Sequence, residues 1–211
     1  MDATDWDTRY READLLWSQG PNLWVEQVAR DLHPGRALDV AAGEGRNAIW
    51  LAERGWSATA LDFSTVALDR ARRIAEERLG TGAARFTTQL ADVLVEAPAP
   101  RAYELVLVVY LQLVADERRK VLREAAEAVA PGGRLLVAAH DSDNIEHGHG
   151  GPSDPAVLYS AADVVADIEG SGLVIERAER VIRVVNTADG EKDALDCLVL
   201  ATRAGQTGLI R

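Results

Sequence analysis

The sequence predicts an α/β fold, a doubly wound, mostly parallel seven-stranded sheet that ends in an antiparallel hairpin. Three observations predict it. Apolar segments along the 211 residues alternate between the period of two that is typical of strands and the period of 3.6 that is typical of helices. A glycine-rich turn, residues 41–45, follows the first strand-like run. Two strand-like segments near the end flank the turn dipeptide Asp189-Gly190, which indicates the hairpin.

The elements follow in order along the chain. The expected strands are 37–41, 57–61, 85–90, 105–109 and 134–139, and the hairpin segments are 174–185 and 195–202. The expected helices are 47–54, 65–79, 116–129 and one that runs from Ser160 to near Gly170. Ser64 fits an N-cap, Gly80 a helix stop, and Ser160 to Asp163 a capping box. Pro131-Gly132-Gly133 is expected to end the third helix before the fifth strand begins.

Composition excludes several classes of partner. The formal net charge is −11, and a field of that sign repels nucleic-acid backbones and anionic membrane surfaces. No apolar run approaches the roughly 20 residues that span a bilayer. The single cysteine, Cys197, cannot form an internal disulfide or a thiolate-rich zinc site. The acidic first residues show no secretory signal, so we expect a cytoplasmic protein.

The glycine-rich turn predicts a nucleotide site. Gly43-x-Gly45-x-x-Ala48 fits the dinucleotide fingerprint, and Asp62 ends the second strand. Asp39 and Glu44 bracket the turn and would oppose the pyrophosphate of NAD, whereas they would attract the sulfonium and ammonium groups of S-adenosylmethionine. Asp62 then suits the ribose diol, because one carboxylate can accept from both hydroxyls. Charge therefore favours S-adenosylmethionine.

These motifs resemble the class I S-adenosylmethionine-dependent methyltransferases, with their Rossmann-like fold, over about residues 36–203. Residues 38–45 match the acid-x-Gly-x-Gly-x-Gly loop with Ala41 in place of the first glycine, a replacement that we expect to require φ below zero. Residues 60–64 resemble the ribose-binding strand end. In Ala91-Asp92-Val93, the resemblance implies that the acid contacts the adenine amino group and the next amide contacts the ring.

A narrower resemblance covers residues 45–52, which look like the Gly-Arg-Asn-x-x-x-Leu-Ala run of tellurite-resistance-type methyltransferases, near the thiopurine type. Those enzymes methylate small, soft sulfur, selenium or tellurium nucleophiles. The resemblance implies a small-molecule acceptor, either of that kind or a small hydroxyl compound. An NAD-dependent oxidoreductase and a non-catalytic nucleotide-binding module remain the alternatives.

The expected cofactor-binding residues are Trp17, Asp39, Ala41, Gly43, Gly45, Arg46, Asn47, Asp62, Phe63, Asp92, Val93 and Val109. The candidate catalytic residues are His140 and Tyr110, because they follow the fifth and fourth strands and ligands bind at those ends of such sheets. A thiolate or selenide acceptor needs no protein base, whereas a hydroxyl needs one, and histidine suits that role. His140 can equally be a strand-end residue bonded to backbone. Tyr110 is expected to pack rather than ionise, because its pKa lies far from neutral.

The remaining expectations concern a cap and a metal. Residues 1–35 are expected to form an N-terminal helical cap on a core of residues 36–211. A Gly20-Pro21 hinge signal makes the first residues a candidate lid, and Trp17 could stack on the adenine or contact the sulfonium. The loop from His140 to Pro155 carries three histidines, so a divalent metal is conceivable, but we expect solvated histidines and no metal.

Overall fold

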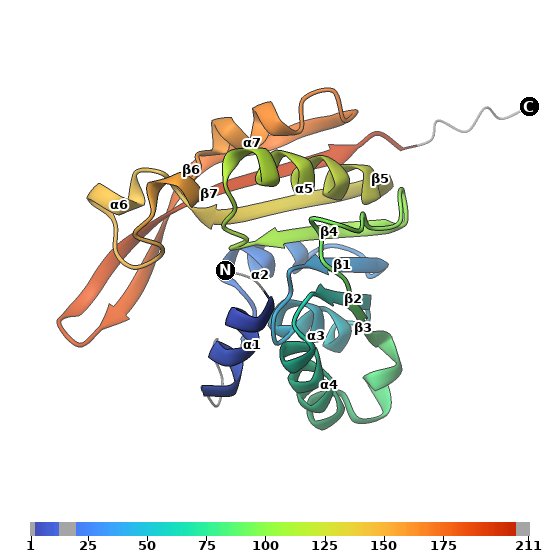
Figure 1. The fold of residues 1–211 in the computed structure, drawn as a ribbon. Helices are drawn as coiled ribbons and strands as arrows, with labels where there is room; N and C mark the ends of the chain where they lie inside the picture. Colours follow the sequence, from blue (N-terminus) through green and yellow to red (C-terminus); the bar gives the residue numbers. More distant parts are fainter. Residues whose placement is uncertain (1–2, 13–19, 206–211) are drawn as a thin grey trace, which may run out of the picture.

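The expected sheet is present in the computed structural model, which describes residues 3–12 and 20–205 (Figure 1). Its seven strands lie in the order β3-β2-β1-β4-β5-β7-β6. Neighbouring strands from β3 to β5 pair in parallel, and β7 pairs antiparallel with both β5 and β6. The strands are β1 (Arg36–Val40), β2 (Ser57–Asp62), β3 (Phe86–Leu90), β4 (Tyr103–Val109), β5 (Val129–His140), β6 (Leu173–Thr187) and β7 (Gly190–Arg203).

Helices cover both faces of this sheet, as a doubly wound fold requires. The α-helices are α1 (Ala3–Glu12), α2 (Leu23–Ala29), α3 (Arg46–Glu53), α4 (Thr65–Leu79), α5 (Ala115–Ala128), α6 (Asn144–His147) and α7 (Ala161–Asp167). Two short 3-10 helices, η1 (Gly80–Arg85) and η2 (Pro155–Val157), complete the described elements. One core packs α5 and α7 against the sheet, and a second packs α2, α3 and α4 against the other face.

Local signals placed several boundaries correctly. The Ser64 hydroxyl accepts from the Ala67 N–H and begins α4, and Gly80 ends that helix with φ +52°. Ser160 and Asp163 form the predicted capping box of α7, with bonds in both directions. These boundaries depend on neighbouring residues alone, so the sequence was sufficient to predict them.

Two boundaries were wrong. β5 begins at Val129, so Pro131-Gly132-Gly133 lies within its range as an irregularity, where the register with β4 shifts. A Cβ on Gly133 would lie 2.9 Å from the Ala130 carbonyl oxygen and 3.0 Å from two β4 carbonyls, so only glycine allows this approach. The hairpin strands are longer than predicted, because β6 and β7 continue to pair beyond the end of β5, where His140 faces Asp196.

Within residues 3–12 and 20–205, no helix combines the length and apolar character needed to cross a bilayer.

Candidate active site

The glycine-rich turn joins β1 to α3 through three residues in the left-handed region. Ala41, Gly43 and Gly45 have φ of +54°, +55° and +73°. The expectation that Ala41 requires φ below zero is therefore wrong: this alanine adopts the conformation of the glycine it replaces, which costs of order 1 kcal/mol. Gly45 is constrained further, because a Cβ there would lie 3.1 Å from the Ala71 Cβ and 3.3 Å from the Phe86 ring. The turn thus packs closely on its surroundings at some cost in backbone strain, with Gly43 and Gly45 buried.

Asp39 lies below this turn as a buried carboxylate. Its Oδ2 is buried without a hydrogen-bond partner among the described residues. Burial raises the pKa of Asp39 to about 7, although a bond from the Asn47 side chain and the charge of Arg46 oppose the rise. A buried oxygen without a donor suits a cationic ligand group, such as the ammonium of S-adenosylmethionine.

Glu44 contributes less to the field at the turn than the sequence indicated. Its buried carboxylate accepts from the Arg70 guanidinium at 3.0 Å. Because that pair is neutral overall, the electrostatic preference for a cation depends mainly on Asp39.

Asp62 braces the turn from the end of β2. Its two oxygens accept from the Gly43 and Ser64 N–H groups, both at 2.8 Å, and the residue is 6% exposed. Burial raises the pKa of Asp62, while these backbone bonds oppose the rise. Each oxygen retains a lone pair, so the carboxylate can still accept from a hydroxyl.

A second polar cluster lies where β4, β5 and β7 meet, and its centre is Asp196. This residue is fully buried, and its Oδ2 accepts from Trp24 Nε1 at 2.9 Å, the Tyr110 hydroxyl at 2.7 Å and Arg183 Nε at 2.8 Å. His140 is the cross-strand partner of Asp196, and its ring centroid lies 4.9 Å from that of Tyr110. The cluster therefore contains both candidate catalytic residues.

A hydrogen-bonded chain links this cluster to Asp39. Asn47 bonds to the Asp39 carboxylate and accepts from the Asn22 N–H at 2.9 Å. Asn22 caps α2 by accepting from the Trp24 N–H at 2.9 Å, and the Trp24 indole bonds to Asp196. A ligand at the turn and a ligand beside His140 would thus both lie next to this one set of linked polar residues.

Comparison with known proteins agrees with this geometry. Residues 37–133 match the family model described as a methyltransferase domain. Residues 37–133 of the chain thus resemble a methyltransferase domain.

Two solved structures share the fold of this chain. The N-methyltransferase NodS from Bradyrhizobium japonicum, in complex with S-adenosylhomocysteine, is 16% identical with a TM-score of 0.70, covering 96% of this chain and 99% of its own. TehB from Haemophilus influenzae is 15% identical with a TM-score of 0.67, covering 96% of this chain and 67% of its own.

A curated relative, the tRNA 5-carboxymethoxyuridine methyltransferase of Escherichia coli (strain K12), is 31% identical over 133 residues. That match covers 62% of this chain and 49% of the relative, so the chain spans about half the length of that enzyme. S-adenosylmethionine is the cofactor of this domain class, and the matches do not favour the NAD-dependent alternative.

The other predicted cofactor residues lie at or just after the ends of strands. The Asp92 side chain is exposed after β3 and accepts from the Leu94 N–H at 2.8 Å, while Val93 beside it is buried. Phe63 and Val109 are half-buried at the ends of β2 and β4. These positions agree with an adenosine lying along the edge of the sheet, which remains a prediction. Trp17 lies outside the described residues.

The sequence did not identify the cluster around Asp196. Trp24 is buried, and its indole donates to Asp196. One signal was available: Asp196 is a lone carboxylate within the otherwise apolar run Leu195 to Ala201. Cys197 beside it is buried, and burial raises the pKa of its thiol to about 12, which makes it unreactive.

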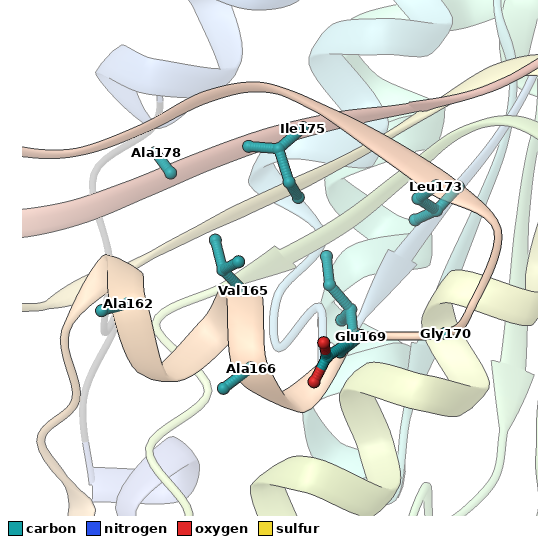
Figure 2. Close-up of a pocket in the computed structure, with 9 residues that line it drawn as sticks. Ala162, Val165, Ala166, Glu169, Gly170, Leu173, Ile175 and Ala178 are labelled. Atoms are coloured by element: carbon teal, nitrogen blue, oxygen red, sulfur yellow. The ribbon is translucent and has the colours of Figure 1, made fainter.

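Two further features are the histidine loop and a hollow beside α7. Over residues 3–12 and 20–205, no group of three or more histidine, cysteine or acidic side chains could hold a metal ion, and His147 and His149 are exposed. A hollow of about 660 Å³ lies between α7 and β6, where Val165 and Ile175 point toward one another (Figure 2). Its lining is apolar apart from Glu169, and it includes no predicted site residue, so we place the chemistry at the strand ends instead.

Proposed function

We propose that this chain transfers a methyl group from S-adenosylmethionine to a small-molecule acceptor. The observation that supports this most is the buried Asp39 Oδ2 without a donor, linked by hydrogen bonds to a polar cluster at the ends of β4 and β5. The cofactor supplies an electrophilic methyl group on a sulfonium, and the protein must position the acceptor and exclude water.

Distinct residues would hold the parts of the cofactor. Asp39 would pair with the ammonium, and the backbone of Ala41, Gly43 and Gly45 would pack against the methionine portion. Asp62 would accept from the ribose, and Asp92 and Val93 would contact the adenine. Each assignment uses a carboxylate or amide whose position at the strand ends is described above.

The acceptor side favours a small molecule. The net charge of −11 opposes close approach of a polyanion such as tRNA, although one relative is named as a tRNA methyltransferase. His140 and Tyr110 are both half-buried, so they fit a compact acceptor rather than an extended surface. Soft sulfur, selenium or tellurium nucleophiles and small hydroxyl compounds are the classes to test.

The N-terminal segment would act as a lid over this site. In α1, the carboxylate of Asp7 accepts a hydrogen bond from the Ser64 hydroxyl, next to the Asp62 carboxylate. Figure 1 shows α1 beside α4, at the same end of the sheet as the turn. This helix would have to move aside to release product.

Two measurements test the proposal. Isothermal titration should show micromolar binding of S-adenosylhomocysteine and no binding of NADH. A screen with labelled cofactor across thiols, selenite, tellurite, phenols, small sugars and unmodified tRNA should then show transfer to a small molecule. Absence of S-adenosylhomocysteine binding, or transfer to tRNA alone, would contradict the proposal.

A further inference from the structure

His140 and Asp196 form a pair whose geometry is nearly that of a proton-accepting dyad. They face each other across the antiparallel β5–β7 ladder, and the His140 Nδ1 lies 3.6 Å from the Asp196 Oδ1. At that separation the two atoms are not yet hydrogen-bonded, and Nδ1 is buried without a partner in the part of the chain described.

The two oxygens of Asp196 are used unequally. Three donors, from Trp24, Tyr110 and Arg183, converge on Oδ2 at 2.7–2.9 Å. Oδ1 accepts one long bond, from Arg183 Nη2 at 3.3 Å. Oδ1 of Asp196 can therefore still accept a hydrogen bond, and it faces the Nδ1 of His140, which has no partner. A small rotation of the imidazole would let Nδ1 donate to Oδ1.

The imidazole is also held from its two sides. The Tyr110 ring lies against it, with centroids 4.9 Å apart. On the loop after α6, a Cβ built on Gly151 would lie 2.8–3.0 Å from three ring atoms of His140, so the backbone there packs directly on the ring. The side chain is 15% exposed, and because Nδ1 is buried, the exposed atoms are elsewhere on the ring.

Burial and the opposing charge of Arg183 outweigh Asp196 and lower the pKa of His140, so the imidazole is neutral near pH 7. Tyr110 cannot serve instead, because burial and the Asp196 carboxylate raise its pKa. His140 is therefore neutral and able to accept a proton at neutral pH, whereas its described neighbours Tyr110 and Arg183 are not proton acceptors there.

We propose that Asp196 is a positioning residue that holds His140 with Nδ1 protonated and Nε2 free, so that Nε2 takes the proton of a hydroxyl acceptor. This rests on the proposed function and narrows its acceptor to a hydroxyl compound. As the acceptor oxygen forms its bond to the methyl carbon, the electron pair of the broken carbon–sulfur bond stays on sulfur, which leaves as a neutral thioether. The acceptor proton passes to Nε2, and the positive charge that disappears from sulfur reappears on an imidazolium beside Asp196.

The test reads the tautomer of His140 directly. Long-range ¹H–¹⁵N spectra of the full chain saturated with S-adenosylhomocysteine should show Nδ1 protonated and Nε2 bare, with the signals assigned by their loss in His140→Gln. Asp196→Asn, with binding of S-adenosylhomocysteine retained, should shift His140 toward the Nε2-protonated form. The Nε2-protonated form in the wild-type protein, or no change in Asp196→Asn, overturns the proposal.

A matched glycine pair keeps the test decisive if Asp196→Asn does not fold. Gly151→Ala should displace the ring and change the His140 signals, whereas Gly150→Ala should not. Gly150 has a similar φ of +76°, but a Cβ there meets nothing within 4 Å, so it controls for backbone strain. Equal effects of both variants overturn the packing argument.

Methyl-transfer rates of the wild-type protein and of His140→Gln provide a second test. If the rate of methyl transfer to phenols or small sugars falls at least 100-fold in His140→Gln, the result supports His140 as the base. Transfer only to thiols, selenite or tellurite, at a rate unchanged in His140→Gln, overturns it. Failure of the wild-type protein to bind S-adenosylhomocysteine would refute the proposed function instead, and the tautomer could still be read in the free protein.

Discussion

Asp39 should make cofactor-product binding depend on pH in a defined direction. Its pKa is raised to about 7 in the free protein, because the carboxyl is buried and one oxygen has no donor. An ammonium group bound there would favour the carboxylate and lower that pKa. Below pH 7, binding then requires the carboxyl to lose a proton. The dissociation constant should therefore be about 100-fold larger at pH 5 than at pH 8, which corresponds to a loss of roughly 3 kcal/mol in binding free energy.

The sign is opposite for the stability of the free protein. A carboxyl whose folded pKa exceeds its unfolded value stabilises the fold when protonated, and this contribution is lost as the pH rises from about 4 through 7. Between pH 5 and pH 8 the free energy of unfolding should fall by roughly 2 to 3 kcal/mol from Asp39 alone. Asp39→Asn should remove this fall.

Titration calorimetry and urea unfolding of the wild-type protein and Asp39→Asn, at four pH values, measure both effects. Taking the difference between the two proteins cancels the contributions of Asp62, of Arg46 and of the ligand itself. At pH 8, Asp39→Asn should bind about 30-fold more weakly, the scale of one charged hydrogen bond. A wild-type dissociation constant that is flat from pH 5 to pH 8, or one with the same slope in Asp39→Asn, would refute the reasoning.

Three further predictions concern the adenosine and the lid. Asp62→Ala should weaken S-adenosylhomocysteine by about 2 kcal/mol in calorimetry, while Asp69→Ala, an exposed acid on α4, should leave it unchanged; equal affinities of the two variants would contradict the ribose assignment. Asp92→Asn retains an acceptor, so it should cost less affinity than Asp92→Ala, and the reverse order would count against an adenine contact. Trypsin should cleave at Arg9 and Arg11 of α1 more slowly when S-adenosylhomocysteine is bound; equal rates would mean that α1 is a fixed part of the fold.

The fold was predictable wherever a local signal defined an element. α4 runs from Thr65 to Leu79 as expected, because its Ser64 cap and Gly80 stop act through adjacent residues. The start of β5 was not predictable in this way. A Pro-Gly-Gly run is typical of a helix end, and only pairing with a distant strand extends β5 back to Val129.

The same distinction between local and distant contacts applies to the residues of the candidate site. The positions of the glycine turn and of the strand ends could be predicted from spacing, because sequence order fixes them, and the cofactor contacts of their residues stay predictions. Asp196 could not, because its partner Trp24 lies 172 positions away and Tyr110 lies 86 positions away. The φ of Ala41 was also beyond reach, because an alanine gives no local indication of left-handed backbone.

The place of β7 in the sheet has a consequence for biosynthesis. This strand follows the other six in the sequence, yet it lies between β5 and β6, and it supplies the carboxylate that joins α2, β4 and β6. A nascent chain on the ribosome can pair β1 through β5 early, but His140 gains its cross-strand neighbour only once residues 190–203 have been translated. We therefore expect the proposed acceptor side to assemble after the proposed cofactor side, so that a partly synthesised chain would bind the methyl donor before the groups around Asp196 are in place.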